Sequence, residues 1–340
     1  MKHRILLLQS LAAAGGRYAL RTAKNFIKLL MGRKAFFNEE GLFFRQYFLH
    51  LTGLRPIRKV TCTGLPGEGV ASQALTIMST INFARMSGLT YVHTPFSVIH
   101  HAERPMKEWA AAWESFFNLG AGEIVSDVRQ SEAVNSCYNF NDLELCFGWQ
   151  GRGDELSRGF RAMVPEFKRK FYLNKSPRTT EEVTVAVHIR RGDVSAERNA
   201  HSFTDTETIL RRIHAVKLIL DAHAVNYRIR VYSQGERADF PELSLPGIEL
   251  FIDVDGVWTM EELIEADILI MAKSCFSFLA ALYSDGIKIS EPWEDSRPME
   301  GCIRCLADGS LDRAAFESQL FQLLQAKAMA ANKESIDSRM

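Results

Sequence analysis

The feature that most constrains the fold of this chain is a strand-like apolar run that ends in a basic hexapeptide. Residues 183–187 read Val-Thr-Val-Ala-Val, which favours a β-strand because β-branched residues dominate and neither proline nor glycine interrupts them. The sequence HIRRGD follows directly at residues 188–193, and Gly192 supplies a turn. The pattern predicts a buried strand with two arginines at its carboxyl end.

The rest of the C-terminal half alternates strands with helices. A helix is expected over 206–222, with Asp205 or Thr204 placed to cap it. Such alternation predicts a parallel, doubly wound α/β sheet, in which ligands bind at the carboxyl ends of the strands. The further expected strands cover 227–232, 248–252, 268–271 and 287–289, and the further helices cover 260–266, 277–283 and 311–331.

The arginine pair at this strand end has two interpretations. The planar guanidinium of Arg190 or Arg191 can donate two parallel hydrogen bonds to a phosphate. Alternatively, the pair is an ordinary surface feature whose charge is balanced by Asp193. Spacing alone leaves both interpretations open.

The N-terminal half contains a second strand–loop–helix–strand unit. Strands are expected at 59–63 and 89–93, with a helix over 72–86 between them. The loop between the first strand and the helix contains Gly67 and Gly69, which would let backbone N–H groups approach a bound anion. The loop is not GxGxxG and has no phosphate-loop lysine, so a simple tight turn is the alternative.

A length of 340 residues predicts two domains. Aromatic side chains are frequent between 97 and 175, where they form either a helical core or the lining of a sugar acceptor groove. The polar, turn-like segment 176–180 marks the junction. The expected parts are an N-terminal segment over 1–50, α/β domains over 51–178 and 179–300, and a C-terminal helix and tail over 301–340.

Composition narrows the function classes. The chain has 41 basic and 41 acidic residues, which excludes a general nucleic-acid binder that works by neutralising phosphates. Of the six cysteines only Cys302 and Cys305 form a CxxC pair, and no further ligands stand at a zinc-site spacing from them. We therefore expect reduced thiols, no zinc site at these cysteines and a cytoplasmic location.

The N-terminal segment is strongly basic. Eight Lys or Arg residues and no acid precede Glu39. Apolar and basic residues recur at helical spacing over 17–31, which predicts a basic amphipathic helix. It would either lie peripherally on an anionic membrane surface or pack on its own domain. No uncharged apolar run is long enough to cross a membrane.

Three motifs in order resemble those of fucosyltransferases that use GDP-fucose. HIRRGD at 188–193 resembles the HxRRxD motif of the alpha-1,2 family and is similar to the HxRR core of alpha-1,6 enzymes. Residues 230–234 take the place of the second motif, although Gln234-Gly235 stands where the family has acids. The run 267–281, with its Ser-Phe-Ser, resembles the third motif, and 64–73 loosely resembles the N-terminal glycine loop.

The resemblance implies a GT-B architecture of two Rossmann-like α/β domains, with the nucleotide held by the C-terminal domain. It implies an inverting glycosyltransferase that moves fucose from GDP-fucose to a glycan hydroxyl without a metal. The alternatives are a GT-B enzyme using another nucleotide sugar and a non-catalytic member that binds a nucleotide or glycan. The implied catalytic residues are Arg190, Arg191 and His188, and the implied donor-binding residues are Asp193, Ser274, Phe276, Ser277, Gly67 and Gly69.

Most of the implied site residues have both a functional and a structural interpretation. Arg190 would contact the β-phosphate, and Arg191 would assist or form a salt bridge, because neighbouring side chains at a strand exit diverge. His188 would position the donor or be a core histidine, and Asp193 would orient the arginines. Ser274 and Ser277 would bind phosphate or cap a helix, while Phe276 would contact guanine or fill the core. The acceptor base is not identified; residues expected to flank the cleft are Glu68, Glu197, His201 and Asp205.

Overall fold

The computed structural model describes residues 43, 46, 47, 49–64, 67–125, 133–135, 143, 147, 152–178, 180–291, 299 and 301–337. The chain divides into two compact units between Asn174 and Lys175, a few residues before the boundary expected from the sequence. The predicted basic helix over 17–31 lies outside the described residues. Within the described part of the chain, no helix has the length and apolarity needed to span a membrane.

The N-terminal unit is built on a parallel sheet of four short strands in the order β3-β2-β1-β4. The strands are β1 (Lys59–Thr61), β2 (Thr90–His93), β3 (Ile124–Val125) and β4 (Val134–Asn135). The helices are α4 (Val70–Met86), α5 (Met106–Phe117) and α7 (Gly153–Phe171), followed by the short 3-10 helix η2 (Tyr172–Asn174). The predicted strand–loop–helix–strand order is therefore confirmed.

Helix α4 is the centre of this unit. Residues on every side of it are buried, as expected for a helix that is covered by both a sheet and other helices. The buried amide of Asn82 donates from Nδ2 to the carbonyl oxygen of Leu156 at 2.9 Å and so ties α4 to α7. On α5 the aromatic side chains pack together as core, with Trp113 and Phe117 stacked at 5.4 Å between ring centroids. For these residues the core interpretation of the aromatic segment is confirmed.

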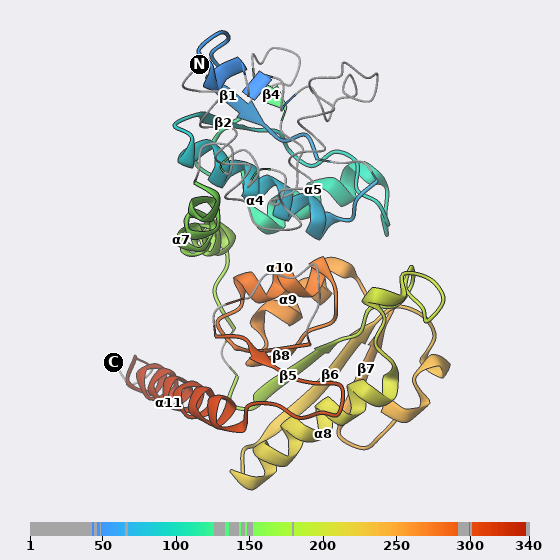
Figure 1. Cartoon of the computed structure of the whole chain (residues 1–340). Helices are drawn as coiled ribbons and strands as arrows, with labels where there is room; N and C mark the ends of the chain where they lie inside the picture. The colour runs from blue at the N-terminus through green and yellow to red at the C-terminus, as the bar shows by residue number, and fades with distance from the viewer. Residues whose placement is uncertain are drawn as a thin grey trace. The chain divides into compact units, whose positions relative to one another are not determined.

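The C-terminal unit contains a six-stranded parallel sheet in the order β10-β9-β8-β5-β6-β7. Figure 1 shows α9 and α10 on one face of this sheet and α8 on the other, which confirms the predicted doubly wound α/β arrangement. The strands are β5 (Val183–His188), β6 (Tyr227–Ser233), β7 (Ile248–Ile252), β8 (Ile268–Ile270), β9 (Ile287–Ser290) and β10 (Ile303–Arg304). The helices are α8 (Thr206–Ala222), α9 (Gly256–Glu265), α10 (Cys275–Tyr283) and α11 (Arg313–Asp337), with 3-10 turns η3 (Ala200–Ser202), η4 (Arg237–Asp239) and η5 (Pro241–Leu243).

Strand β5 lies inside the sheet and pairs with β6 on one side and β8 on the other. Val185, for example, stands opposite Ile229 and Ile268. Alternate side chains of a strand point to opposite faces, so Val185 and Val187 enter the apolar core that α8 covers. His188 belongs to the other face, which α9 and α10 cover. Pairing on both sides therefore fixes which way each residue at the end of β5 points.

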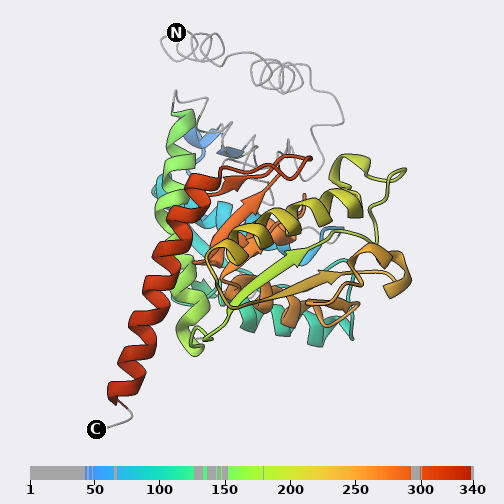
Figure 2. The same ribbon diagram turned by 90° about the horizontal axis from the view of Figure 1, so that it is seen from below.

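Two helices complete the apolar side of this sheet. Asp205 caps α8 by accepting a hydrogen bond from the backbone N–H of Thr208 at 2.8 Å, so the predicted cap is confirmed. Figure 2 shows α11 as one long helix, and its first turns bury Phe316 and Leu320 in the same core as α8. Strand β10, only two residues long, was not predicted because its sequence is too short to show a period.

Gly286, between α10 and β9, tests how tightly this sheet is packed. A β-carbon at Gly286 would lie 2.3 Å from the carbonyl oxygen of Ala266 and 2.6 Å from that of Asp267. Both are backbone atoms before β8, so Gly286→Ala should destabilise the unit by about 1–3 kcal/mol. We expect amide hydrogen exchange in β8 and β9 to accelerate by at least about fivefold.

Gly69→Ala is the matched control, because a β-carbon there would meet no atom within 4 Å and the residue has an ordinary φ of −71°. It should leave exchange in β8 and β9 unchanged. Equal exchange in the Gly286→Ala variant and the native chain would contradict the packing described.

Candidate functional site

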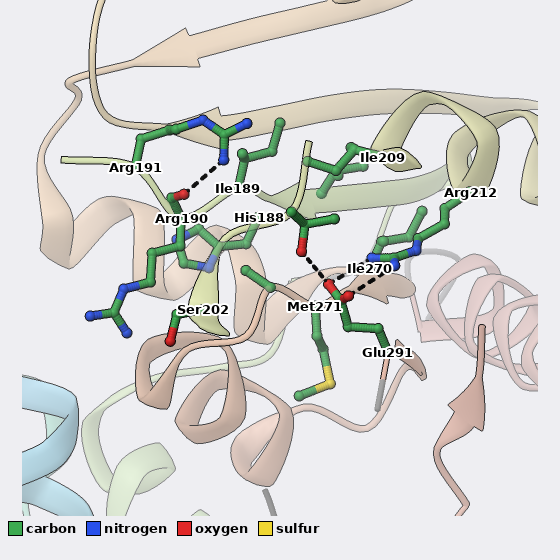
Figure 3. Close-up of a pocket in the computed structure, with 13 residues that line it drawn as sticks. His188, Ile189, Arg190, Arg191, Ser202, Ile209, Arg212, Ile270, Met271 and Glu291 are labelled. Atoms are coloured by element: carbon green, nitrogen blue, oxygen red, sulfur yellow. Dashed lines mark hydrogen bonds and ion pairs between the residues drawn. The ribbon is translucent and has the colours of Figure 1, made fainter. Parts of the chain in front are cut away.

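A small pocket lies at the carboxyl edge of the C-terminal sheet, where β5, β8 and β9 end (Figure 3). Ile189 still continues the ladder, since its N–H donates to the carbonyl oxygen of Tyr232 at 2.9 Å, and the chain then turns away. The sequence HIRRGD thus lies at the expected edge of the sheet. The polar residues lining the pocket are His188, Arg190, Arg191, Ser202, Thr204, Arg212 and Glu291.

The two adjacent arginines point in opposite directions, as Figure 3 shows. Arg191 folds back onto the protein: its guanidinium donates to the carbonyl oxygen of Arg190 at 2.9 Å and lies 4.6 Å from the ring centre of Phe203. A second ring, that of Phe240, lies 5.8 Å away. Burial lowers the pKa of Arg191, although Asp205 and Asp239 act the other way. The side chain of Arg191 therefore braces the loop.

Arg190 is the more available of the two. Its guanidinium donates to the Asp193 carboxylate at 3.0 Å, and the Arg190 side chain is 28% exposed. Within the part of the chain that the structure describes, no other hydrogen bond to this guanidinium is found. Asp193 thus orients Arg190 and leaves most of its N–H groups available to an oxyanion.

The loop after the arginines is closely packed. Gly192 has a φ of +76°, and a β-carbon there would lie 2.5 Å from Oε1 of Gln234. The carbonyl oxygen of Asp193 accepts hydrogen bonds from Arg198 at 3.0 Å and from Asn199 at 2.9 Å. Gln234, which stands where the resembling family has an acid, thus packs against the glycine of HIRRGD. These contacts hold the loop in place.

His188 faces α10. Its Nδ1 lies 2.6 Å from the hydroxyl oxygen of Ser277, and its ring centre is 5.4 Å from that of Phe276. Burial, and secondly the positive charge of Arg190, lower the pKa of His188 to about 3. The imidazole is therefore uncharged at neutral pH and contributes a hydrogen-bonding group rather than a charge.

The two serines of the third motif are both engaged within the protein. Ser274 caps α10 by accepting a hydrogen bond from the N–H of Phe276 at 3.1 Å. Ser277 accepts from the N–H of Ala272 at 3.0 Å besides contacting His188. Phe276 is half-buried beside His188. Roles for these three residues in donor binding stay predictions.

The sequence analysis missed a buried ion pair in the wall of the pocket. Arg212 of α8 donates two hydrogen bonds to Glu291, at 2.8 and 3.0 Å, and the side chains are only 3% and 9% exposed. Glu291 also accepts from the Thr204 hydroxyl at 2.6 Å and pairs with Lys273 at 3.1 Å. Burial by itself would raise the pKa of Glu291, but the hydrogen bonds from Arg212 and Thr204 outweigh it and lower the pKa.

A signal for this pair was present in the sequence. Arg212 falls on the apolar face of α8, between the buried Ile209 and Ile213, and a buried arginine requires a carboxylate partner. Glu291 directly follows β9, so it emerges at the same edge as HIRRGD. The pair joins α8 to the end of β9 and so holds two sides of the pocket.

The glycine-rich loop of the N-terminal unit is held by a glutamine. The buried Gln73 of α4 donates from Nε2 to the carbonyl oxygens of Glu68 and Val98, each at 2.9 Å. A β-carbon on Gly64 would meet Gln73, whereas Gly67 and Gly69 have open space around them. Contact of those two glycines with the donor stays a prediction.

The four acceptor-base candidates differ in how they are engaged. Asp205 is occupied as the cap of α8, and Glu197 accepts a hydrogen bond from the Ser195 hydroxyl at 2.9 Å. Glu68 and His201 are exposed. These contacts identify no base.

The sequence analysis predicted reduced cysteine thiols and no metal cofactor. Among the described residues, no group of three or more His, Cys, Asp or Glu side chains is placed to hold a metal ion. Cys302 and Cys305 are free thiols, and burial raises the pKa of both. The Cys302 thiol donates to the Ser290 hydroxyl at 3.2 Å. The predicted lack of a metal cofactor stays a prediction.

The chain matches no protein family model and no curated protein. Similar solved structures include the E. coli heptosyltransferase WaaC with ADP-2-deoxy-2-fluoro heptose, with 12% identity, coverage of 82% of this chain and 100% of that chain, and a TM-score of 0.37. Fucosyltransferase NodZ from Bradyrhizobium has 15% identity, coverage of 75% and 98%, and a TM-score of 0.38. POFUT1 in complex with GDP-fucose has 13% identity, coverage of 67% and 94%, and a TM-score of 0.36. Likeness at this level says nothing about donor or acceptor, which have to be argued from the residues of this chain.

The buried pair gives a stability prediction with an internal control. Glu291→Ala should lower the free energy of unfolding by about 3–5 kcal/mol, because it leaves the guanidinium of Arg212 buried without a carboxylate. Glu207→Ala removes a neighbouring ion pair on the surface, between Glu207 and Arg211. Because the Glu207 side chain is 79% exposed, this variant should lose less than about 1 kcal/mol of unfolding free energy. Urea unfolding monitored by circular dichroism measures both variants. Equal midpoints for the two would contradict the structural role given to Glu291.

Proposed function

We propose that this chain is a glycosyltransferase that binds the diphosphate of a nucleotide sugar at the carboxyl edge of its C-terminal sheet. The observation that carries the proposal is the position of Arg190. Its guanidinium stands at the end of an interior strand, oriented by Asp193 at 3.0 Å and otherwise open to an oxyanion. A planar donor held in advance where negative charge develops is what the departure of a nucleoside diphosphate requires.

The donor we propose is GDP-fucose, and the reaction is transfer to a glycan hydroxyl with inversion. A bond forms between the acceptor oxygen and the anomeric carbon while the bond from that carbon to the β-phosphate oxygen breaks. GDP leaves with the electron pair, and the acceptor proton passes to a base. Arg190 stabilises the negative charge that grows on GDP, so the proposed mechanism needs neither a metal nor an enzyme nucleophile.

Two further parts of the proposal concern the whole protein. The two α/β units would form a GT-B enzyme, with the nucleotide on the C-terminal unit. The chain would work in the cytoplasm, with the basic segment 17–31 contacting the inner face of a membrane. Support for that contact is the stripe of lysines and arginines at helical spacing in the sequence.

A second candidate function comes from Gln234. It stands in place of an acid of the fucosyltransferase motif and packs against Gly192. This departure favours either a different nucleotide sugar or binding without catalysis. Both alternatives keep the diphosphate contact of Arg190 and differ in the base, the sugar or the turnover.

Arg190→Lys is expected to lower kcat/KM for transfer by about a hundredfold, because a single ammonium cannot reproduce bidentate hydrogen bonding to the diphosphate. The measurement is GDP release from GDP-fucose in the presence of glycan extracts. Arg211→Lys is the matched control, since Arg211 lies on the exposed face of α8 and pairs with Glu207. Turnover near that of the native chain in Arg190→Lys would refute the role of Arg190.

The nucleotide itself can be identified by thermal stability. A ligand that binds only the folded chain stabilises it by about 2.7 kcal/mol at a hundred times its Kd. We therefore expect GDP to raise Tm, and UDP and ADP to leave it unchanged. A shift with ADP or UDP instead would assign another nucleotide sugar. A shift with GDP but no sugar release with any glycan extract would favour the non-catalytic alternative.

A further inference from the structure

The Ser277 hydroxyl makes two hydrogen-bonding contacts inside the protein. The Ser277 side chain is completely buried in the first turn of α10. The hydroxyl oxygen accepts the backbone N–H of Ala272 at 3.0 Å and lies 2.6 Å from Nδ1 of His188. Ser277 therefore joins the end of β8 to the end of β5.

These contacts decide where the imidazole proton lies. If Nδ1 of His188 carried the proton, the Ser277 oxygen would accept two N–H groups, and its own hydroxyl proton would have no acceptor among the described residues. A buried hydroxyl without an acceptor costs about 1–3 kcal/mol. If Ser277 donates to Nδ1 instead, its hydroxyl both accepts from Ala272 and donates to His188, and the ring proton lies on Nε2.

We propose that Ser277 is a positioning residue that holds His188 as an uncharged imidazole with its proton on Nε2, so that His188 acts as a hydrogen-bond donor and not as a proton acceptor. The proposal rests on the proposed function only where it assigns that donor to the sugar nucleotide. It separates the two serines of the third motif. Ser274 caps α10, whereas Ser277 acts through His188.

The charges around His188 favour the same state. A proton added to the ring would occupy Nδ1, break the bond from Ser277, and place a positive charge beside Arg190. On α10 the neighbours Phe276 and Ser277 carry no charge. The other charged residues lining the pocket are Arg191, Arg212 and Glu291, and Lys273 pairs with Glu291 outside the lining.

For the reaction, this state makes His188 a hydrogen-bond donor and leaves proton acceptance to another group. A neutral N–H donor at Nε2 can hydrogen-bond to a phosphate or sugar oxygen at any pH near neutrality, as Arg190 does beside it. Because Nδ1 is occupied by Ser277 and Nε2 already carries a proton, His188 cannot accept the proton of the acceptor hydroxyl. That proton has to go to another group.

The test is nuclear magnetic resonance of the full chain labelled with 15N in its histidine rings. Long-range proton–nitrogen correlation distinguishes a protonated from an unprotonated ring nitrogen, and the His188→Gln variant identifies the signal among the nine histidines. From about pH 5 to about pH 8, where an ordinary histidine titrates, we expect a constant spectrum with Nδ1 unprotonated and Nε2 protonated. A protonated Nδ1, or titration within this range, would overturn the proposal.

Ser277→Ala removes the donor to Nδ1, so the His188 signal should change to a mixture of both tautomers. Ser284→Ala is the matched control, because it removes another buried hydroxyl, at the residue directly after α10, which accepts from the N–H of Gly286 at 3.0 Å. It should leave the His188 signal unchanged. An unchanged signal in Ser277→Ala would refute the role of Ser277, and if that variant does not fold, the spectrum of the native chain still decides.

Activity supplies a separate readout. If the donor is GDP-fucose, Ser277→Ala should lower kcat/KM by about tenfold, the loss expected for one hydrogen bond of about 1.4 kcal/mol, and Ser277→Thr should restore part of it. The expected tautomer without transfer from any nucleotide sugar would refute the proposed function and leave this inference intact. Transfer of fucose together with a proton on Nδ1 would refute this inference and leave the proposed function intact.

Discussion

Pairing of β5 on both sides is the constraint on which the candidate site depends. The backbone ladder to β6 and β8 holds β5 in one register, and the ladder continues to Ile189. Because side chains alternate along a strand, that register sends His188 towards α10 and leaves Ile189 in the core under α8. A shift of one residue would exchange the two faces and bury the charged side chains that the pocket now displays.

Three arginines near this edge have three different surroundings. Arg190 is half-open and held by one carboxylate, Arg191 lies against aromatic rings, and Arg212 is buried in a bidentate pair with Glu291. Guanidinium groups tolerate all three because they are weakly hydrated and offer several donors in one plane. Only Arg190 is left with donors directed to something other than the protein, which is why the proposed function depends on it.

Much of this could be predicted from local patterns. Strand composition, turn glycines and helical periodicity placed β5, α8 and the strands β6 to β9, and the position of Asp205 before Thr206 made it one of two candidate caps. The contacts between distant segments could not be predicted in the same way. The hydrogen bond from Gln73 to the carbonyl oxygen of Val98 and the contact of Ser277 with His188 join residues whose separation in sequence follows no helical or strand period.

The sequence by itself determined the α/β class of both units, the order of their elements and the edge at which HIRRGD emerges. These follow from local propensity and from the rule that parallel strands end on one side of a sheet. Only the tertiary structure decided that Arg190 stays open while Arg191 folds back, that Ser277 contacts His188, and that Arg212 needs Glu291. The physical reason is that hydrogen bonds and ion pairs of buried groups are satisfied by whatever neighbours the packing brings, and the packing joins residues far apart in the chain.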